Sequence, residues 1–358
     1  MGLPSTGSKA KKRDQIIAID IGGRSTKAIY LQRRGDSFVL LNYAVLDTPS
    51  QDKSPTVEQL TELLTKVNQA LGPTRTKQVT IALGGPDMVF KQVELPQVPA
   101  EDLRQMMRYN SKSYLQQDLP DYVFDCFFLP LRELPNLPEA GKGPAGSGKH
   151  KAAVGGVKKE LLDILQAAVR AAGWIPDQVI PGVVGPINAF EMAEPEIFRN
   201  EVAGLVDIGF KNTTISILHA GELALNRVVA IGGDKLTGGL AESMGISYEE
   251  AEGIKVCMAA EVQAGLESLI NPLGRELRAS LDFFEHQYDK PVGQVFLSGA
   301  SARNECLVQS LQTELLVPCK TWNATRFLQM GLPADKLGSV EDIAGQLTTA
   351  VGAAVTAF

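Results

Sequence analysis

One sequence pattern occurs twice in this chain, in Ile16–Tyr30 (IIAIDIGGRSTKAIY) and in Leu205–Leu218 (LVDIGFKNTTISIL). This repeat is the strongest indication of the fold. In both stretches an apolar run leads to Asp-Ile-Gly, a short polar turn follows, and a second apolar run completes a hairpin. Glycine lets the turn backbone approach an anion closely, and the amides and hydroxyls of the turn supply hydrogen-bond donors. The repeat therefore predicts two phosphate-binding hairpins, in two similar domains that close on one nucleotide.

An aspartate ends the first strand of each hairpin, at Asp20 and at Asp207. If the two domains close on one ligand, both carboxylates face the same space, where a hydrated Mg²⁺ that bridges phosphate oxygens would join the two halves. The alternative is that each aspartate only caps its own turn, since Asp before Gly is common in turns. The duplication favours the metal and phosphate role for both residues.

Three further segments carry a resemblance to known families. Val295–Asn304 (VFLSGASARN) looks like the adenosine motif of the actin-like ATPase superfamily. Gly232–Thr237 (GGDKLT) together with Ser247–Lys255 (SYEEAEGIK) resembles the second-domain signature shared by the cell-division FtsA family and the type IV pilus PilM family. Leu83–Pro96 (LGGPDMVFKQVELP) resembles the inserted subdomain of the PilM family. The likeness spans nearly the whole chain from about residue 15.

The resemblance implies an α/β protein with the actin-like ATPase fold, made of two related ribonuclease H-like domains and an inserted α+β subdomain. The expected parts are a disordered basic tail (1–14), the start of the first domain (15–77), the inserted subdomain (78–156) with a mobile loop (135–150), the completion of the first domain (157–200), the second domain (201–340) and a connecting C-terminal helix (341–358). The segment Asp342–Phe358, which is rich in Ala and Gly, resembles the second connecting helix of the fold.

The same resemblance implies that ATP and Mg²⁺ bind between the two domains. Glu252 and Lys255 would contact ribose and adenine, although a plain ion pair within one helix is the alternative reading of their spacing. Lys27 would face a phosphate or bridge the domains, or else point to solvent. The expected nucleotide-binding residues are Asp20, Gly22, Gly23, Arg24, Ser25, Lys27, Asp207, Gly209, Lys211, Asn212, Thr213, Gly232, Gly233, Asp234, Glu252, Lys255, Gly299, Ala300, Ser301 and Arg303.

The segment expected to connect the domains, Pro181–Phe190 (PGVVGPINAF), contains no acid that could orient an attacking water. FtsA-like chains tend to have Glu-Pro where this chain has Gly185-Pro186, and the turn at Ser298–Ser301 is less glycine-rich than the family pattern. We therefore expect at most a slow ATPase, and weak or lost nucleotide affinity stays open. A small-molecule kinase of the same superfamily is disfavoured because no carboxylate is evident above an acceptor pocket.

The resemblance also implies a partner. The inserted subdomain of the PilM family receives the N-terminal cytoplasmic tail of the inner-membrane protein PilN, and a groove beside a sheet would hold such a peptide in an extended form. The expected function is thus an ATP-binding scaffold of a type IV pilus or related type II secretion assembly, with an FtsA-like filament protein as the alternative. Other pilus assembly proteins and self-association remain open. The expected partner-binding residues are Phe90, Val93, Leu95, Leu103, Met106, Met107 and Tyr114.

Composition agrees with these expectations. The chain has 358 residues and a net charge of −6, and no basic face of the kind that binds nucleic acid is visible. Its four cysteines are scattered and form no metal-binding or disulfide pattern, which fits a reducing cytoplasm. No apolar run approaches the ~18 residues of a membrane span. We expect a cytoplasmic protein that lies at the inner membrane through its partner.

Overall fold

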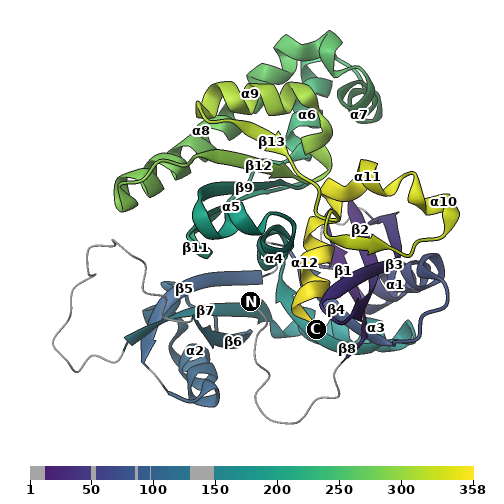
Figure 1. Ribbon diagram of the computed structural model, residues 1–358, viewed down its shortest axis with the longest axis vertical. Coiled ribbons are helices and arrows are strands. Elements are labelled where there is room, and N and C mark those ends of the chain that lie inside the picture. Colours follow the sequence, from purple (N-terminus) through teal and green to yellow (C-terminus); the bar gives the residue numbers. More distant parts are fainter. Residues whose placement is uncertain (1–12, 50–53, 85–87, 97, 130–148) are drawn as a thin grey trace.

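The computed structural model describes residues 13–49, 54–84, 88–96, 98–129 and 149–358. Within this range the chain forms three sheets, and Figure 1 shows two of them stacked, with helices between them and outside them. Most of the expected basic tail and nearly all of the expected loop over 135–150 fall outside the described residues. Arg13, where the described chain begins, forms an ion pair with Asp177.

The first lobe is built on a six-stranded sheet with the strand order β14-β3-β2-β1-β4-β8. Alternate residues of β1 are buried on opposite faces: Ile17 and Ile19 pack under the outer helices, whereas Ile16 and Ala18 face the middle of the molecule. This period of two is what a strand buried on both faces requires. The elements are β1 (Gln15–Ile21), β2 (Ser25–Arg34), β3 (Ser37–Asp47), β4 (Gln78–Leu83), β8 (Ile175–Pro181) and β14 (Leu328–Met330), with the outer helices α1 (Val57–Leu71) and α3 (Lys159–Ala171).

The second lobe is built on a five-stranded sheet with the order β11-β10-β9-β12-β13. Its outer face packs against α6, α8 and α9 in a separate hydrophobic core. The elements are α5 (Pro195–Asn200), β9 (Val202–Ile208), β10 (Thr213–His219), β11 (Glu222–Val229), α6 (Gly233–Met244), α7 (Tyr248–Cys257), the 3₁₀ turn Ala259–Val262, α8 (Gln263–Tyr288), β12 (Gln294–Ser298), the 3₁₀ turn Ala300–Arg303, α9 (Glu305–Leu315) and β13 (Cys319–Thr321).

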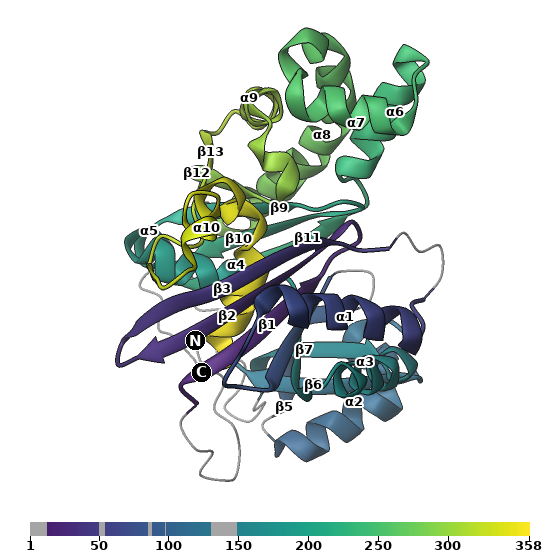
Figure 2. The ribbon, with the colours of Figure 1, turned by 90° about the vertical axis from the view of Figure 1, so that its right-hand side faces the viewer.

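Two crossing helices, α4 (Val184–Ala193) and α12 (Thr348–Thr356), lie between the two sheets (Figure 2). Their backbones touch at two glycines. A Cβ atom added to Gly352 would lie 1.7 Å from the carbonyl oxygen of Gly185, so no larger residue fits at that point. The helices that connect the lobes are therefore held together by backbone contact.

The last helix is shorter than the sequence predicts. Instead of one helix over 342–358, the chain forms α11 (Val340–Ile343), a 3₁₀ turn (Ala344–Gln346) and then α12. The carbonyl oxygen of Gly345 accepts a hydrogen bond from the amide of Gly299 at 2.8 Å, and glycine is a weak helix former. The interruption brings the start of α12 beside the turn after β12.

A segment that the sequence pattern assigned to the second domain joins the first lobe instead. Strand β14 pairs in parallel with β3, and α10 (Ala334–Leu337) follows it. The Nζ atom of Lys336 donates hydrogen bonds of 2.8 Å to the side chain of Asn42 and to the carbonyl of Tyr43. A three-residue strand is too short to show a period of two, so no local pattern predicts this pairing.

The inserted subdomain consists of a three-stranded sheet, with the order β5-β7-β6, and one helix. Three of its expected partner-binding residues, Leu95, Leu103 and Met107, are 0–1% exposed and form its own core. A buried side chain offers no surface to a partner, so these three positions are corrected to core positions. The elements are β5 (Met88–Pro96), α2 (Ala100–Leu115), β6 (Tyr122–Phe128) and β7 (Lys149–Lys158). In the described part of the chain, every helix is too short or too polar to cross a bilayer.

Candidate functional site

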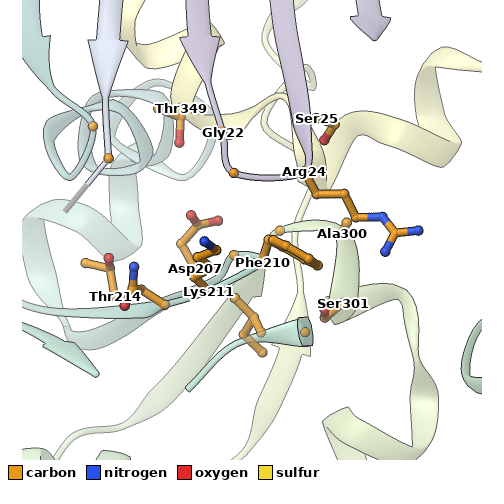
Figure 3. Close-up of a pocket in the computed structure, with 18 of the residues that line it drawn as sticks. Gly22, Arg24, Ser25, Asp207, Phe210, Lys211, Thr214, Ala300, Ser301 and Thr349 are labelled. Atoms are coloured by element: carbon orange, nitrogen blue, oxygen red, sulfur yellow. The ribbon is translucent and has the colours of Figure 1, made fainter. Parts of the chain in front are cut away.

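A cleft of about 840 Å³ separates the two lobes, and the two repeated hairpins face each other across it (Figure 3). Three of the expected nucleotide-binding residues, Thr213, Gly232 and Asp234, do not line it. The expected residues that do line it are Asp20, Gly22, Gly23, Arg24, Ser25, Lys27, Asp207, Gly209, Lys211, Asn212, Gly233, Glu252, Lys255, Gly299, Ala300, Ser301 and Arg303.

The two hairpin turns have matching backbone geometry. A Cβ atom added to Gly22 would lie 2.6 Å from the carbonyl oxygen of Ser25, and one added to Gly209 would lie 2.9 Å from that of Asn212. Each glycine comes two residues after its aspartate and faces the carbonyl three residues further on. Both turns therefore fold tightly enough to exclude a side chain at this point, which leaves the backbone open toward the cleft.

The two aspartates are buried and have different partners. Lys27 Nζ lies 3.5 Å from Asp20 Oδ2, and Ser298 donates a 2.8 Å hydrogen bond to Asp207 Oδ1. Burial raises the pKa of Asp20, although the Lys27 ammonium acts in the opposite direction. Burial also raises the pKa of Asp207, and the nearby charge of Asp20 adds to that rise. Two carboxyl groups held near each other favour the binding of a cation between them.

A second polar cluster comes from α6 and α7. Lys255 Nζ lies 2.6 Å from both Glu252 Oε2 and Thr237 Oγ1, and the Glu252 carboxylate lies 3.7 Å from Arg24 Nη1 of the other lobe. Burial alone would raise the pKa of Glu252, but hydrogen bonds from Lys255 and Thr237 outweigh it, so the pKa is lowered. The ion pair expected from the spacing of Glu252 and Lys255 is present, and both side chains also line the cleft.

The three expected residues outside the cleft have structural partners. Thr213 Oγ1 donates to the carbonyl of Ile231 at 2.7 Å, and Asp234 Oδ1 accepts a 2.8 Å hydrogen bond from the hydroxyl of Tyr248. At Gly232, an added Cβ would lie 2.3 Å from the carbonyl oxygen of Phe210. These three residues lie within the expected motifs but hold the backbone around the cleft.

Phe210 is a cleft residue that sequence reasoning missed. It occupies the position in the second hairpin that Gly23 occupies in the first, and a Cβ on Gly23 would lie 3.5 Å from its ring. The guanidinium carbon of Arg24 lies 5.6 Å from the centre of the same ring. The sequence contained one signal for this contact, since a large residue stands in one hairpin where glycine stands in the other. Two turns that touch need a small residue on one side.

The second crossing segment also contributes residues that were not expected, Gln346 and Thr349. They line the cleft because the helix is interrupted before α12, and the sequence pattern does not predict this interruption.

The charged residues of the cleft are mainly cationic, although the chain as a whole has a net negative charge. Five cationic residues line the cleft against three acidic ones, namely Arg24, Lys27, Lys211, Lys255 and Arg303 against Asp20, Asp207 and Glu252.

Comparison with known proteins agrees with this geometry. The sequence profile of the type IV pilus assembly protein PilM family matches residues 187–358. The structure matches a chain of the PilM-PilN type IV pilus biogenesis complex with a TM-score of 0.79 and 20% identity, covering 95% of this chain and 97% of that chain. The profile covers just under half of the chain, so this chain is similar to PilM over residues 187–358 and shares the fold of the PilM structure over nearly its whole length. The predicted actin-like fold is thereby confirmed.

More distant matches share the same fold or part of the sequence. The chain is 24% identical over 256 residues to the cell division protein FtsA of Bacillus subtilis (strain 168). The aligned region covers 67% of this chain and 57% of FtsA. EutJ of Carboxydothermus hydrogenoformans matches with a TM-score of 0.57 and 14% identity, over 97% and 92% of the two chains. MreB 5 of Spiroplasma citri, a structure with bound AMPPNP, matches with a TM-score of 0.50 and 10% identity, over 89% and 93%.

Proposed function

We propose that this PilM-like protein binds ATP in the cleft between its lobes. The observation that carries the proposal is the pair of matching glycine turns, which face one cleft whose charged residues are mainly cationic. Backbone amides in tight turns and surrounding cations together favour a polyphosphate. Nucleotide in the related MreB 5 structure is consistent with this assignment.

The lining residues divide by the part of the ligand that each would meet. The turns at Gly22 and Gly209, with Lys27 between them, would hold the phosphates from both lobes. Glu252 and Lys255 would meet the ribose and adenine, as the family resemblance implies. Because Glu252 Oε2 already accepts from Lys255 and Thr237, its other oxygen is the one that a ribose hydroxyl would reach.

The residues present also fit Mg²⁺. Within the described ranges, no group of three or more His, Cys, Asp or Glu side chains could hold a metal ion. Mg²⁺ is commonly bound by one or two carboxylates and completed by waters and substrate phosphates, so Asp20 and Asp207 are a sufficient protein contribution. When bound, the ion would neutralise phosphate charge between the lobes.

Nucleotide binding is tested by thermal unfolding with and without Mg-ATP. A ligand at a hundredfold excess over its Kd stabilises the folded state by about 2.7 kcal/mol, so the melting temperature should rise. Asp207→Asn should lose most of this rise. Asp234→Asn is the matched control, because that carboxylate pairs with Tyr248 and does not line the cleft. Wild-type protein that is indifferent to all nucleotides contradicts the proposal.

We further propose that the protein acts in type IV pilus assembly and binds the cytoplasmic tail of a PilN-like membrane protein through the inserted subdomain, which would place it at the inner membrane. The PilM family profile and the match to a PilM-PilN complex support this. Of the expected contact residues, those left at least partly exposed are Phe90, Val93, Met106 and Tyr114. Because strand residues alternate faces, Phe90 lies on the face of β5 opposite Val93, and it lines the cleft between the lobes. A peptide on the α2 side would therefore meet Val93, Met106 and Tyr114.

The partner site is tested by binding of a tail peptide from a PilN-like protein to the full chain. Tyr114→Ala should weaken binding at least tenfold, and Tyr114→Phe, which keeps the ring packed against the subdomain core, should keep the melting temperature and most of the affinity. Tyr109→Ala is the control, because Tyr109 lies on the same helix with 79% of its surface exposed and packs in no core. Equal affinity for Tyr114→Ala, Tyr109→Ala and wild type, with Phe90→Ala also silent, would place the partner elsewhere.

A further inference from the structure

One mostly buried side chain in the wall of the cleft carries a hydroxyl that has no partner among the described residues and is accessible from the cleft. Thr349 on α12 lines the cleft, is 8% exposed, and forms no hydrogen bond through its side chain with any residue that the structure describes. Figure 3 shows its hydroxyl oxygen pointing into the cavity, on the side where the Asp207 carboxylate lies. The neighbouring Thr356 differs, since its hydroxyl donates to Gly352 at 2.8 Å. An unpartnered hydroxyl that is fixed in the wall of a cavity and points into it is suited to hold a water or a ligand oxygen.

The position of this hydroxyl is set by the helix crossing. A Cβ atom on Gly185 of α4 would lie 2.6 Å from the carbonyl oxygen of Thr349 and 2.7 Å from its Cα atom. Any side chain at 185 would therefore push α12 away. The backbone of Thr349 thus fills the space that a side chain at position 185 would need.

We propose that Thr349 is a positioning residue that holds a water in the cleft. This inference rests on the proposed ATP binding. In hydrolysis the water oxygen bonds to the γ-phosphorus while the bond from that phosphorus to the β,γ-bridging oxygen breaks. ADP leaves with the electron pair, and the water's proton passes to solvent. The Thr349 hydroxyl keeps the water on the cleft side of α12 and is not itself consumed.

The test compares Thr349→Val, which keeps the shape but removes the hydroxyl, with Thr349→Ser, which keeps the hydroxyl. Single-turnover phosphate release is measured with excess full-length protein over ATP, and nucleotide affinity is measured separately. One hydrogen bond corresponds to about a five- to tenfold change in rate. We expect that loss for Thr349→Val with ATP affinity within twofold of wild type, and near-wild-type release for Thr349→Ser.

The outcomes separate this inference from the proposed function. If wild type binds ATP but releases phosphate no faster than buffer, or if Thr349→Val matches wild type, the positioning role is overturned and nucleotide binding stands. If wild type binds no nucleotide, both fall. Thr349→Ala, which also lacks the hydroxyl and adds no atoms, provides the same comparison if Thr349→Val does not fold. Thr348→Val is the control, because that side chain bonds to Gly345.

Discussion

The two hairpins of the cleft share one sequence pattern but neutralise their aspartates in different ways. Asp20 lies opposite Lys27 in the register of its own hairpin, so its counter-charge is local. Asp207 receives its hydrogen bond from Ser298 on β12, 91 residues further along the chain. The comparison shows that a repeated motif can fix the same backbone turn while the electrostatics of each copy depend on different parts of the chain.

The largest difference should appear when each carboxylate is made neutral. Asp20→Asn leaves the Lys27 ammonium, whose side chain is 15% exposed, without its carboxylate, and should lower the free energy of unfolding by about 3 kcal/mol. Asp207→Asn should cost less than about 0.5 kcal/mol or stabilise, because the amide oxygen still accepts from Ser298 and repulsion from Asp20 is relieved. Urea unfolding of the protein without ligand measures both. Equal losses would refute the difference between the two copies.

Substitution of the turn glycine should also destabilise the first hairpin more than the second, by a smaller margin than the aspartate substitutions do. An added methyl group at Gly22 meets the Ser25 carbonyl at 2.6 Å and also Lys27 Nζ at 3.0 Å, whereas at Gly209 only the Asn212 carbonyl is near, at 2.9 Å. Gly22→Ala should cost about 2–3 kcal/mol and Gly209→Ala about 1 kcal/mol, measured by thermal unfolding.

Gly253→Ala is the control for the two turn substitutions. It lies within α7, where an added Cβ meets no atom within 4 Å, so it should be neutral or stabilising. If Gly209→Ala costs as much as Gly22→Ala, the two turns are equally rigid and Lys27 plays no part in the difference.

The second lobe's charged cluster should respond to pH in a defined direction. The pKa of Glu252 is lowered below its ordinary value of 4.5, so the stability it contributes is present above that value and is lost as pH falls through the folded-state pKa. Glu252→Gln should cost about 1 kcal/mol at pH 7, since a charge-assisted hydrogen bond is roughly twice as strong as a neutral one. The difference from wild type should shrink below about pH 4.5. A difference that grows in acid would contradict this assignment.

The direct contact between the hairpins should give the smallest effect. Arg24 lies over the Phe210 ring at 5.6 Å, but its side chain is 46% exposed, so solvent weakens the interaction. A double-mutant cycle with Arg24→Gln and Phe210→Leu should give a coupling of about 0.5 kcal/mol. A coupling above about 2 kcal/mol would mean that this contact, and not the crossing helices, holds the lobes together.

Features that depend only on neighbouring residues could be predicted from the amino-acid sequence. Both hairpins follow from apolar runs on either side of a glycine turn, because strand periodicity and turn conformation are local properties. The same is true of α1, whose apolar residues Leu60, Leu64, Val67 and Leu71 recur at helical spacing. Most residues expected at the cleft line it for this reason, since they are carried by those local motifs.

Contacts between segments that are far apart in the chain could be seen only in the folded protein. The break before α12 depends on a hydrogen bond from Gly299 to Gly345, and the access of Thr349 to the cleft depends on the absence of a side chain at Gly185. Met107 lies on a helical stripe that would suit either a core or a surface, and burial assigned it to the core. Such outcomes depend on packing between segments far apart in the chain, which no local pattern encodes.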